Sequence, residues 1–451
     1  MEKSTVAPKP DSPAALRRSR LPGRFARLPE LAGPGFLPLG LFARLPLAML
    51  TVGTLTLITA VSHSYAVGGM AAGAVGIGSA LGAPVLGSLA DRAGQRVVLL
   101  VAAVVNTLAV AALLAAAYLT PAYGSPADAV GVLIAAFLAG ASCPQVGPMA
   151  RVRWMALTTR NLSPAATGGS RSVASNRADL DTALSYEGTA DEITFVLGPA
   201  LVGLLASLVA PWLPLALAAL MTITLVPAFA VHPSQLAVVP APRVPRAGVE
   251  SSVEQETALT RRSRWSGAVV AVPVVAMVCM GTFFGATQNA LSAYSAQYAT
   301  AEIAGLLYAV MGLSSAVAAL SVAFWPQRFS LASRWVAAAL AMTGLSALLF
   351  LPSGIWPMVF VLLLLGIPVG PVMVTVFSIG GVVAPAGRMA TVMTALASGI
   401  VAGTALGSYL AGQLAQTQGA AAAFGVSMGA AAGLLLLGAV TWLVMKRRPQ
   451  S

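Results

Sequence analysis

The sequence predicts an all-α integral membrane protein with 12 transmembrane helices in two pseudo-symmetric six-helix bundles. Three observations support this fold class. Hydrophobic residues make up 57% of the 451 residues and charged residues only 9%, whereas soluble domains carry about 25% charged residues. Twelve apolar stretches approach the length of about 20 residues that a spanning helix needs. All 26 lysines and arginines lie at or near the chain ends or in even-numbered connections.

The positions of these cations set the expected orientation. They occupy residues 3–44, Arg92 and Arg96, 151–177, 243–264, Arg328 and Arg334, Arg388, and 446–448. Because Lys and Arg are retained on the cytoplasmic side of a membrane, both termini are expected in the cytoplasm and the protein in the plasma membrane. The net charge of +12 is dispersed along that face. This favours contact with anionic lipid over binding of nucleic acid.

The twelve spans are expected to be helical, because lipid cannot satisfy exposed backbone polar groups. They cover residues 41–63, 66–90, 97–119, 128–150, 182–209, 212–231, 266–290, 302–324, 335–351, 355–382, 389–413 and 420–445. The connection at 151–181 is polar and is interpreted as a cytoplasmic loop.

The polar segments divide the chain into domains. A cytoplasmic tail at 1–40 precedes a six-helix bundle at 41–231. A central cytoplasmic loop at 232–265, rich in Pro, Arg, Glu and Ser, separates it from a second bundle at 266–445, and a short tail follows at 446–451. The first tail lacks the apolar core and cleavage site of a signal peptide, so the first span is expected to be retained.

A faint internal repeat supports the two-bundle arrangement. Span 4 contains GASCPQVGPM (140–149) and span 10 contains GIPVGPVM (366–373), so both fourth helices carry Gly and Pro pairs. Parallel repeats of this kind are typical of transporters. Ordinary enrichment of Gly and Pro in membrane helices is the alternative explanation.

The sharpest local motif joins spans 2 and 3 and reads Gly87-Ser-Leu-Ala-Asp91-Arg92-Ala-Gly94-Gln-Arg96. Its glycines allow a tight turn and close approach of another backbone. The acid among the arginines suits a charged latch that breaks and re-forms as two bundles rock. The alternative is a cytoplasmic loop that happens to contain an acid.

This string resembles the loop motif of the major facilitator superfamily, G-x-L-a-D-R-x-G-x-R/K, and with twelve spans and a central loop the resemblance covers the whole chain. In span 5, Gly198-Pro199-Ala-Leu-Val-Gly203 partly matches a Gly-Pro element of exporters that use proton antiport. The resemblance implies a tightly packed helix that limits leak.

Two parts of the sequence depart from that family. In many family antiporters span 4 carries an Arg shortly before a Gly, whereas the residues before Gly140 contain none. If Asp91 needs such a partner, Arg151 or Arg153 must take the role, or coupling works differently. The second-half counterpart of the loop motif, WPQRFSLASRW at 325–335, is degenerate.

Glu187, Asp191 and Glu192 begin span 5 and are the candidates for proton coupling. A carboxylate near the bilayer centre costs roughly 2.5–3.5 kcal/mol on insertion scales, so such acids are functional by default. Their clustering favours protonation of at least one of them. The alternative places them at the cytoplasmic lip of the membrane, because the apolar residues 193–209 are nearly long enough to cross it.

Polar side chains inside other spans are candidates for a substrate pocket: Gln145 in span 4, Gln288 and Asn289 in span 7, and Tyr294 just beyond it. Helix-to-helix hydrogen bonds, worth about 0.6 kcal/mol each, are the alternative. His63 and His232 are expected at the two membrane surfaces without a functional role.

Glycines four residues apart form two small-residue faces, Gly78 and Gly82 in span 2 and Gly399, Gly403 and Gly407 in span 11. Small residues let helices touch. The family resemblance implies that spans 2 and 11 meet across the two bundles, which would make these faces a sliding interface.

Several function classes are excluded. A phosphate-binding loop needs a Gly-Lys-Ser/Thr, and the lysines are Lys3, Lys9 and Lys446 only. No H-E-x-x-H or C-x-x-C motif occurs, and the two histidines lie apart on opposite membrane faces, which argues against a membrane hydrolase, so no enzyme, nucleotide, metal or cofactor is expected. Cys143 and Cys279 lie in spans, which argues against a disulfide framework.

The family resemblance implies a secondary active transporter that works by alternating access as a monomer in the lipid bilayer. The favoured function is proton-coupled efflux, by antiport, of a small amphipathic or drug-like molecule. The alternative is uptake or facilitated diffusion of a sugar or other small metabolite on the same fold. A membrane enzyme or a non-transporting sensor is a remote third class.

Overall fold

The computed structural model describes residues 23–120, 128–160, 173–239, 253–298, 303–326 and 328–446. Within these ranges every regular element is a helix, and there is no strand. Twelve helices are long and apolar enough to cross a membrane. The predicted all-α fold with 12 transmembrane helices is therefore confirmed.

The first half of the chain forms six spans, of which the first combines α2 with α3 and the fourth combines α6 with α7. Its elements are η2 (Arg24–Arg27), α1 (Leu28–Ala32), α2 (Phe36–Phe42), α3 (Leu45–Ser62), α4 (Tyr65–Ala93), α5 (Gln95–Leu119), α6 (Val130–Ala141), α7 (Val146–Arg160), α8 (Val173–Leu208), α9 (Leu213–Val231) and η3 (Pro233–Ala237).

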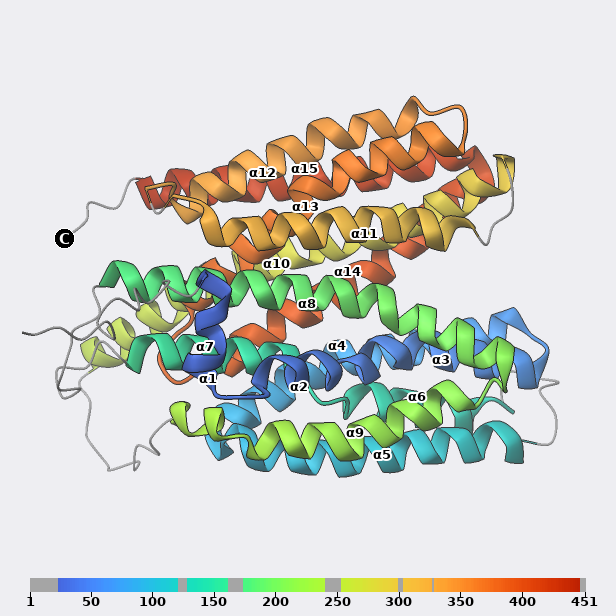
Figure 1. The fold of residues 1–451 in the computed structure, drawn as a ribbon, viewed down its shortest axis with the longest axis horizontal. Coiled ribbons are helices and arrows are strands. Elements are labelled where there is room, and N and C mark those ends of the chain that lie inside the picture. Colours follow the sequence, from blue (N-terminus) through green and yellow to red (C-terminus); the bar gives the residue numbers. More distant parts are fainter. Residues whose placement is uncertain are drawn as a thin grey trace, which may run out of the picture.

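The second half forms the other six spans. Its elements are α10 (Val253–Tyr298), α11 (Ile303–Ser321), η4 (Val322–Phe324), α12 (Leu331–Ser346), η5 (Ala347–Phe350), α13 (Ile355–Val383), α14 (Met389–Gln418) and α15 (Ala420–Lys446). The two halves lie side by side as two helix bundles (Figure 1). We call them the N-bundle, α2 to α9, and the C-bundle, α10 to α15.

Both bundles have an even number of spans, so the chain enters α2 and leaves α15 on the same side. We call this side, which carries the helix ends at Phe36 and Lys446, the terminal face; it lies on the left in Figure 1. Residues 1–22 of the predicted tail at 1–40, and residues 447–451 at the other end, lie outside the described residues. The rest of that tail is mostly helical, and α2 already belongs to the first span.

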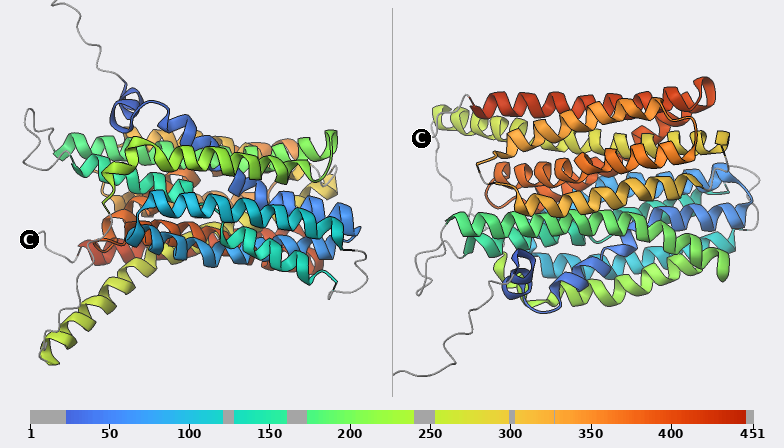
Figure 2. Two further views of the ribbon diagram at one scale, coloured as in Figure 1. Left: turned by 90° about the horizontal axis from the view of Figure 1, so that it is seen from below. Right: turned by 45° about the horizontal axis from the view of Figure 1, so that its top comes forward.

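Several helices are longer than the apolar stretches that predicted them. Span 5 was expected from residue 182, but α8 begins at Val173, and span 7 was expected from residue 266, but α10 begins at Val253. The first turns of α10 project beyond the bundle at the terminal face (Figure 2). The second part of the predicted central loop is therefore helical, because hydropathy marks the lipid-contacting length, whereas capping decides where a helix ends.

Span 4 is interrupted, although its sequence resembles that of span 10. Helix α6 ends at Ala141 and α7 begins at Val146, whereas α13 continues through Pro368 and Pro371. Pro144 has no backbone N–H to continue the ladder of hydrogen bonds. The interruption places the first turn of α7 deep in the N-bundle, where Gly147 lies beside Asp191.

The two glycine faces pack inside the bundles. A Cβ on Gly403 would lie 2.0 Å from the carbonyl oxygen of Val278 in α10, and one on Gly82 would lie 2.0 Å from that of Ala141 in α6. Helices α4 and α14 do meet across the bundles, but the contact uses Gly87 instead. The expected sliding interface is therefore not formed by these faces.

Candidate functional site

The three candidate acids lie near the middle of the 36-residue helix α8. The side chains of Glu187 and Asp191 are 1% and 16% exposed, and Glu192 is 6% exposed. Helix α8 starts about five and a half turns before the apolar stretch that follows them, and it packs against α3, α7 and α11. The structure thus surrounds all three with protein.

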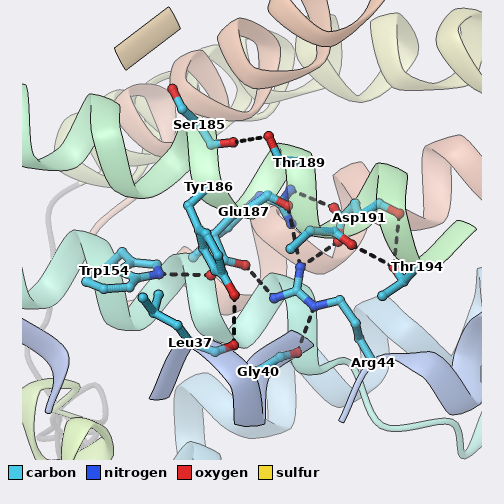
Figure 3. Close-up of polar contacts among 12 residues, drawn as sticks. Leu37, Gly40, Arg44, Trp154, Ser185, Tyr186, Glu187, Thr189, Asp191 and Thr194 are labelled. Carbon is cyan, nitrogen blue, oxygen red and sulfur yellow. Dashed lines mark hydrogen bonds and ion pairs between the residues drawn. The ribbon is translucent and has the colours of Figure 1, made fainter. Parts of the chain in front are cut away.

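Two arginines neutralise two of the acids. Arg44, at the start of α3, places one nitrogen 2.6 Å from Glu187 Oε2 and the other 2.7 Å from Asp191 Oδ1 (Figure 3). Arg151 of α7 lies 2.6 Å from the other oxygen, Asp191 Oδ2. Two cations therefore balance two carboxylates in this cluster, which we call the charge cluster (Arg44, Arg151, Glu187 and Asp191).

Sequence reasoning missed the role of Arg44, which it treated as one of the cations that set orientation. A signal was present, because Arg44 lies inside the predicted span 41–63, and an ionisable residue inside a span is a functional candidate by default. The partner of Arg44 lies 143 residues away along the chain, so only the tertiary structure identifies the pair.

Aromatic side chains cover the charge cluster. Trp154, which is fully buried, donates a hydrogen bond of 2.9 Å from Nε1 to Glu187 Oε1 (Figure 3). Phe377 of the C-bundle lies against the guanidinium of Arg151, 3.9 Å from ring centroid to Cζ. Because the ring belongs to the other bundle, Arg151 loses this cover if the bundles separate there.

Glu192 differs from the other two acids. Its Oε1 accepts a hydrogen bond of 2.8 Å from the hydroxyl of Ser315 in α11, across the interface between the bundles. One turn earlier in α8, Thr189 donates to the carbonyl oxygen of Ala316 at 2.9 Å. In the part of the chain that the structure describes, no basic side chain pairs with Glu192.

Asp91 joins α4 to the first turn of α14. Its carboxylate accepts hydrogen bonds from the backbone N–H groups of Ala390 at 2.9 Å and Thr391 at 2.8 Å, and from the Thr391 hydroxyl at 2.6 Å. The carboxylate thus acts as a helix cap from another bundle, where the positive end of the helix dipole favours a negative charge.

The other residues of the loop motif have separate roles. A Cβ on Gly87 would lie 2.0 Å from Thr394 Oγ1, so this glycine permits the approach of α14. Gly94 has φ +89°, a conformation that favours glycine at the turn. Arg92 and Arg96 are exposed, and among the described residues neither forms an ion pair with Asp91.

A second contact of this kind comes from the degenerate loop in the second half. Arg334 of α12, which is 2% exposed, lies 3.3 Å from Asp181 of α8. The Arg334 guanidinium also donates to the carbonyl oxygens of Phe329 and Pro326 within its own loop. Each bundle therefore uses the loop after its second span to contact the other bundle at the terminal face.

Arg151 and Arg153 were considered as partners of Asp91, but the structure gives them other partners. Arg151 pairs with Asp191 as described. Arg153 donates to Gln95 Oε1 at 2.9 Å and to the carbonyl oxygen of Phe229 at 2.8 Å. It therefore caps the end of α9 and braces α7 against α5.

The sequence comparison decides the family. The model described as Major Facilitator Superfamily matches residues 36–400. The chain belongs to the major facilitator superfamily. No curated protein sequence matches this member.

Solved structures of the superfamily share its fold. A bacterial homologue of the iron transporter ferroportin, in an outward-facing state with soaked iron, is 15% identical with a TM-score of 0.63, over 92% of this chain and 98% of that chain. The human organic anion transporter MFSD10 is 17% identical with a TM-score of 0.62, over 89% and 98%. The fucose:proton symporter FucP of E. coli is 15% identical with a TM-score of 0.58, over 89% and 98%.

The pocket candidates of this superfamily member do not gather at the charge cluster. Gln145 donates to the carbonyl oxygen of Cys143 at the break in span 4, and Asn289 donates to that of Gly285. Gln288 is exposed. Tyr294 donates to carbonyl oxygens of the connection between α12 and α13, 3.0 Å away, so it holds that loop.

The Gly-Pro element packs inside the N-bundle. A Cβ on Gly198 would lie 2.6 Å from that of Ala48, so this glycine brings α8 against α3. Pro199 lies within the same helix, and a Cβ on Gly203 would meet no other atom within 4 Å. The element thus packs tightly at its start only.

The two histidines end helices. His63 ends α3 with φ 53° and is exposed. His232 follows α9, and its ring nitrogens lie within hydrogen-bonding distance of Ser234 Oγ and the carbonyl oxygen of Pro34. Among the described residues no group of three or more His, Cys, Asp or Glu side chains is arranged to hold a metal ion.

Proposed function

We propose that this member of the superfamily is a proton-coupled secondary active transporter that exports a small amphipathic or drug-like molecule by antiport. The central support is Glu192. Arg44 and Arg151 balance the charges of Glu187 and Asp191, so Glu192 is the remaining acid of the three, and an unbalanced buried carboxylate favours binding a proton.

The position of Glu192 supports a role in alternating access. Its hydrogen bond to Ser315 crosses from one bundle to the other, so the surroundings of the carboxylate change when the bundles rock. A proton carrier needs this property, because it must take up a proton from one side of the membrane and release it on the other. Asp191 and Glu187 complete the proton-coupling group through the charge cluster.

The contacts between the bundles support a state that is closed at the terminal face. Asp91 with Thr391, Asp181 with Arg334 and the ring of Phe377 on Arg151 all join the bundles toward that face. In our proposal the protein lies in the plasma membrane with the terminal face in the cytoplasm, as the distribution of Lys and Arg predicts. A state closed at that face is then an outward-facing state. Asp91 is then the main residue of the cytoplasmic latch.

Export, rather than uptake, is supported by the Gly-Pro element. Gly198 brings α8 against Ala48 without space for a side chain, which is consistent with a helix that limits proton leak. The break in span 4 puts the first turn of α7, with Gly147, beside the charge cluster, and discontinuous helices commonly form transporter binding sites. We therefore propose the substrate site there, in a monomer.

Proton movement in proteoliposomes tests this function. The purified protein is reconstituted with an internal pH dye, and a panel of cationic, neutral and anionic amphipathic compounds is applied across an imposed pH difference. We expect at least one compound to move against the direction of the protons. Proton movement in the same direction as the substrate would instead indicate cotransport, and substrate flux without proton movement would indicate facilitated diffusion.

The variant Glu192→Gln tests the contribution of this acid independently of the other residues of the site. We expect this variant to exchange substrate across the membrane but to lose proton-driven accumulation and the pH dependence of exchange. Glu30→Gln is the control, because Glu30 is an exposed acid on α1, and it should behave like the unmodified protein. Retention of proton-driven accumulation by Glu192→Gln would refute the role of Glu192.

A further inference from the structure

The segment that leads into the first span, together with the first helix of that span, lies at the terminal face. We call η2, α1 and α2, residues 24–42, the strap. Most of the strap is fastened to the N-bundle: Arg27 lies 3.3 Å from Asp179 of α8, and the hydroxyl of Tyr186 donates to the carbonyl oxygen of Leu37 at 2.8 Å (Figure 3).

An aromatic contact strengthens this attachment. Phe36 is 1% exposed and meets the edge of Trp154, with ring centroids 5.1 Å apart at an interplanar angle of 86°. It also packs on Phe229, 5.6 Å away. Buried aromatic pairs of this geometry stabilise packing beyond the area that they bury, so the strap and the N-bundle are expected to move as one body.

The tip of the strap contacts the C-bundle instead. Arg24 donates a hydrogen bond to the carbonyl oxygen of Ala323, and its guanidinium lies over the ring of Phe324, 5.4 Å from the centroid. Phe25 packs on the same ring, with centroids 6.0 Å apart. Both residues contacted belong to η4, which ends span 8 at the terminal face.

We propose that the strap is a brake on opening of the terminal face. It is attached to one bundle along its length and to the other bundle by Arg24 and Phe25, so the terminal face opens only after these two contacts break. The proposal rests on the alternating access of the proposed function. It adds an element whose η2 and α1 lie outside the twelve spans and which acts separately from the latch at Asp91.

The strap also contacts the charge cluster. Phe36 packs on Trp154, whose indole donates to Glu187, and the strap leads directly into Arg44, which pairs with the same acid. A change at Glu187 is therefore transmitted to the base of the strap through one packed aromatic pair. This connection makes the brake sensitive to whether the cluster is intact.

Distance measurements between the bundles test the brake without any transport assay. Spin labels are placed at Ala93 on α4 and Val382 on α13, both exposed at the terminal face, after Cys143 and Cys279 are replaced by alanine. Double electron–electron resonance then gives the populations of the closed and open terminal face. We expect Arg24→Ala with Phe25→Ala to raise the open population about five- to tenfold.

The control is Arg328→Ala, which removes an exposed arginine of the neighbouring loop and should leave both populations unchanged. An unchanged open population in the strap variant, with two populations present in the parent protein, would refute the brake and leave alternating access standing. A single population in the parent protein at every pH and with every compound would overturn both proposals.

A cross-link between Phe25→Cys and Phe324→Cys provides an independent test, in which the contact is locked instead of removed. We expect the disulfide-linked protein to show only the closed population and no transport. Reduction of the disulfide should restore the open population and transport. Full transport by the cross-linked protein would refute the brake, because the strap would then not need to release.

Discussion

The hydroxyl of Ser315 donates a 2.8 Å hydrogen bond to Glu192 across the interface between the two bundles. The donor is fully buried and the acceptor nearly so. The backbone of Glu192 belongs to the N-bundle, and its neutral hydrogen-bond partner belongs to the C-bundle. Protonation of this acid is therefore linked directly to movement of the bundles. The neighbouring acids lack this link, because their partners Arg44 and Arg151 belong to the same bundle as they do.

Replacing Ser315 by alanine is expected to change the pH dependence of exchange. Without the hydroxyl, Glu192 loses its hydrogen bond to the C-bundle, so the pH profile of exchange should differ from that of the unmodified protein. The exchange rate should change by up to about tenfold, since a hydrogen bond of about 1.4 kcal/mol corresponds to a factor of ten. Ser314→Ala is the control, because Ser314 donates to Met311 within its own helix. An unchanged profile would separate Ser315 from the coupling step.

Replacing Arg44 by glutamine is expected to destabilise the protein strongly. Two buried carboxylates, Glu187 and Asp191, lose a partner, and breaking a buried pair costs about 3–5 kcal/mol. Adding Glu187→Gln restores the charge balance and should recover more than half of the loss. Thermal unfolding in detergent and a double-mutant cycle measure this coupling. Equal stability of the single and double variants would show that the pair contributes little.

Asp91→Asn is expected to weaken the contact between α4 and α14 while leaving the substrate range unchanged. The amide still accepts a hydrogen bond but loses the charge that favours the start of α14, a change of about 1 kcal/mol. The open population of the terminal face should therefore rise about three- to tenfold. The spin-label pair described above measures this change. A shift in substrate preference would contradict a latch, because Asp91 has no contact with the charge cluster.

Gly87→Ala is expected to separate α4 from α14. Its methyl group would overlap Thr394 Oγ1 and approach the carbonyl oxygen of Ala390 to 2.7 Å, so the closed terminal face should be populated at least tenfold less. Gly76→Ala on the same helix is the matched control, since no other atom lies within 4 Å of its added Cβ. Helix propensity predicts a gain of about 1 kcal/mol there. Equal populations in the two variants would refute the close approach.

The amino-acid sequence by itself determined the class of the protein. Apolar length, cation placement and the motif from Gly87 to Arg96 predicted twelve helices and the superfamily, because the bilayer imposes these patterns locally on the chain. The same reasoning selected Glu187, Asp191 and Glu192 as costly residues. It did not predict their partners, because Arg44 and Ser315 lie more than a hundred residues away from these acids along the chain.

Only the tertiary structure decided how these residues divide their roles. It paired Arg44 with two of the acids and left Glu192 facing the other bundle, and it gave Asp91 a helix end as its partner instead of an arginine. The physical reason is that pairing inside a membrane depends on which helix faces meet. Those faces are set by packing across both bundles, which hydropathy along one chain does not record.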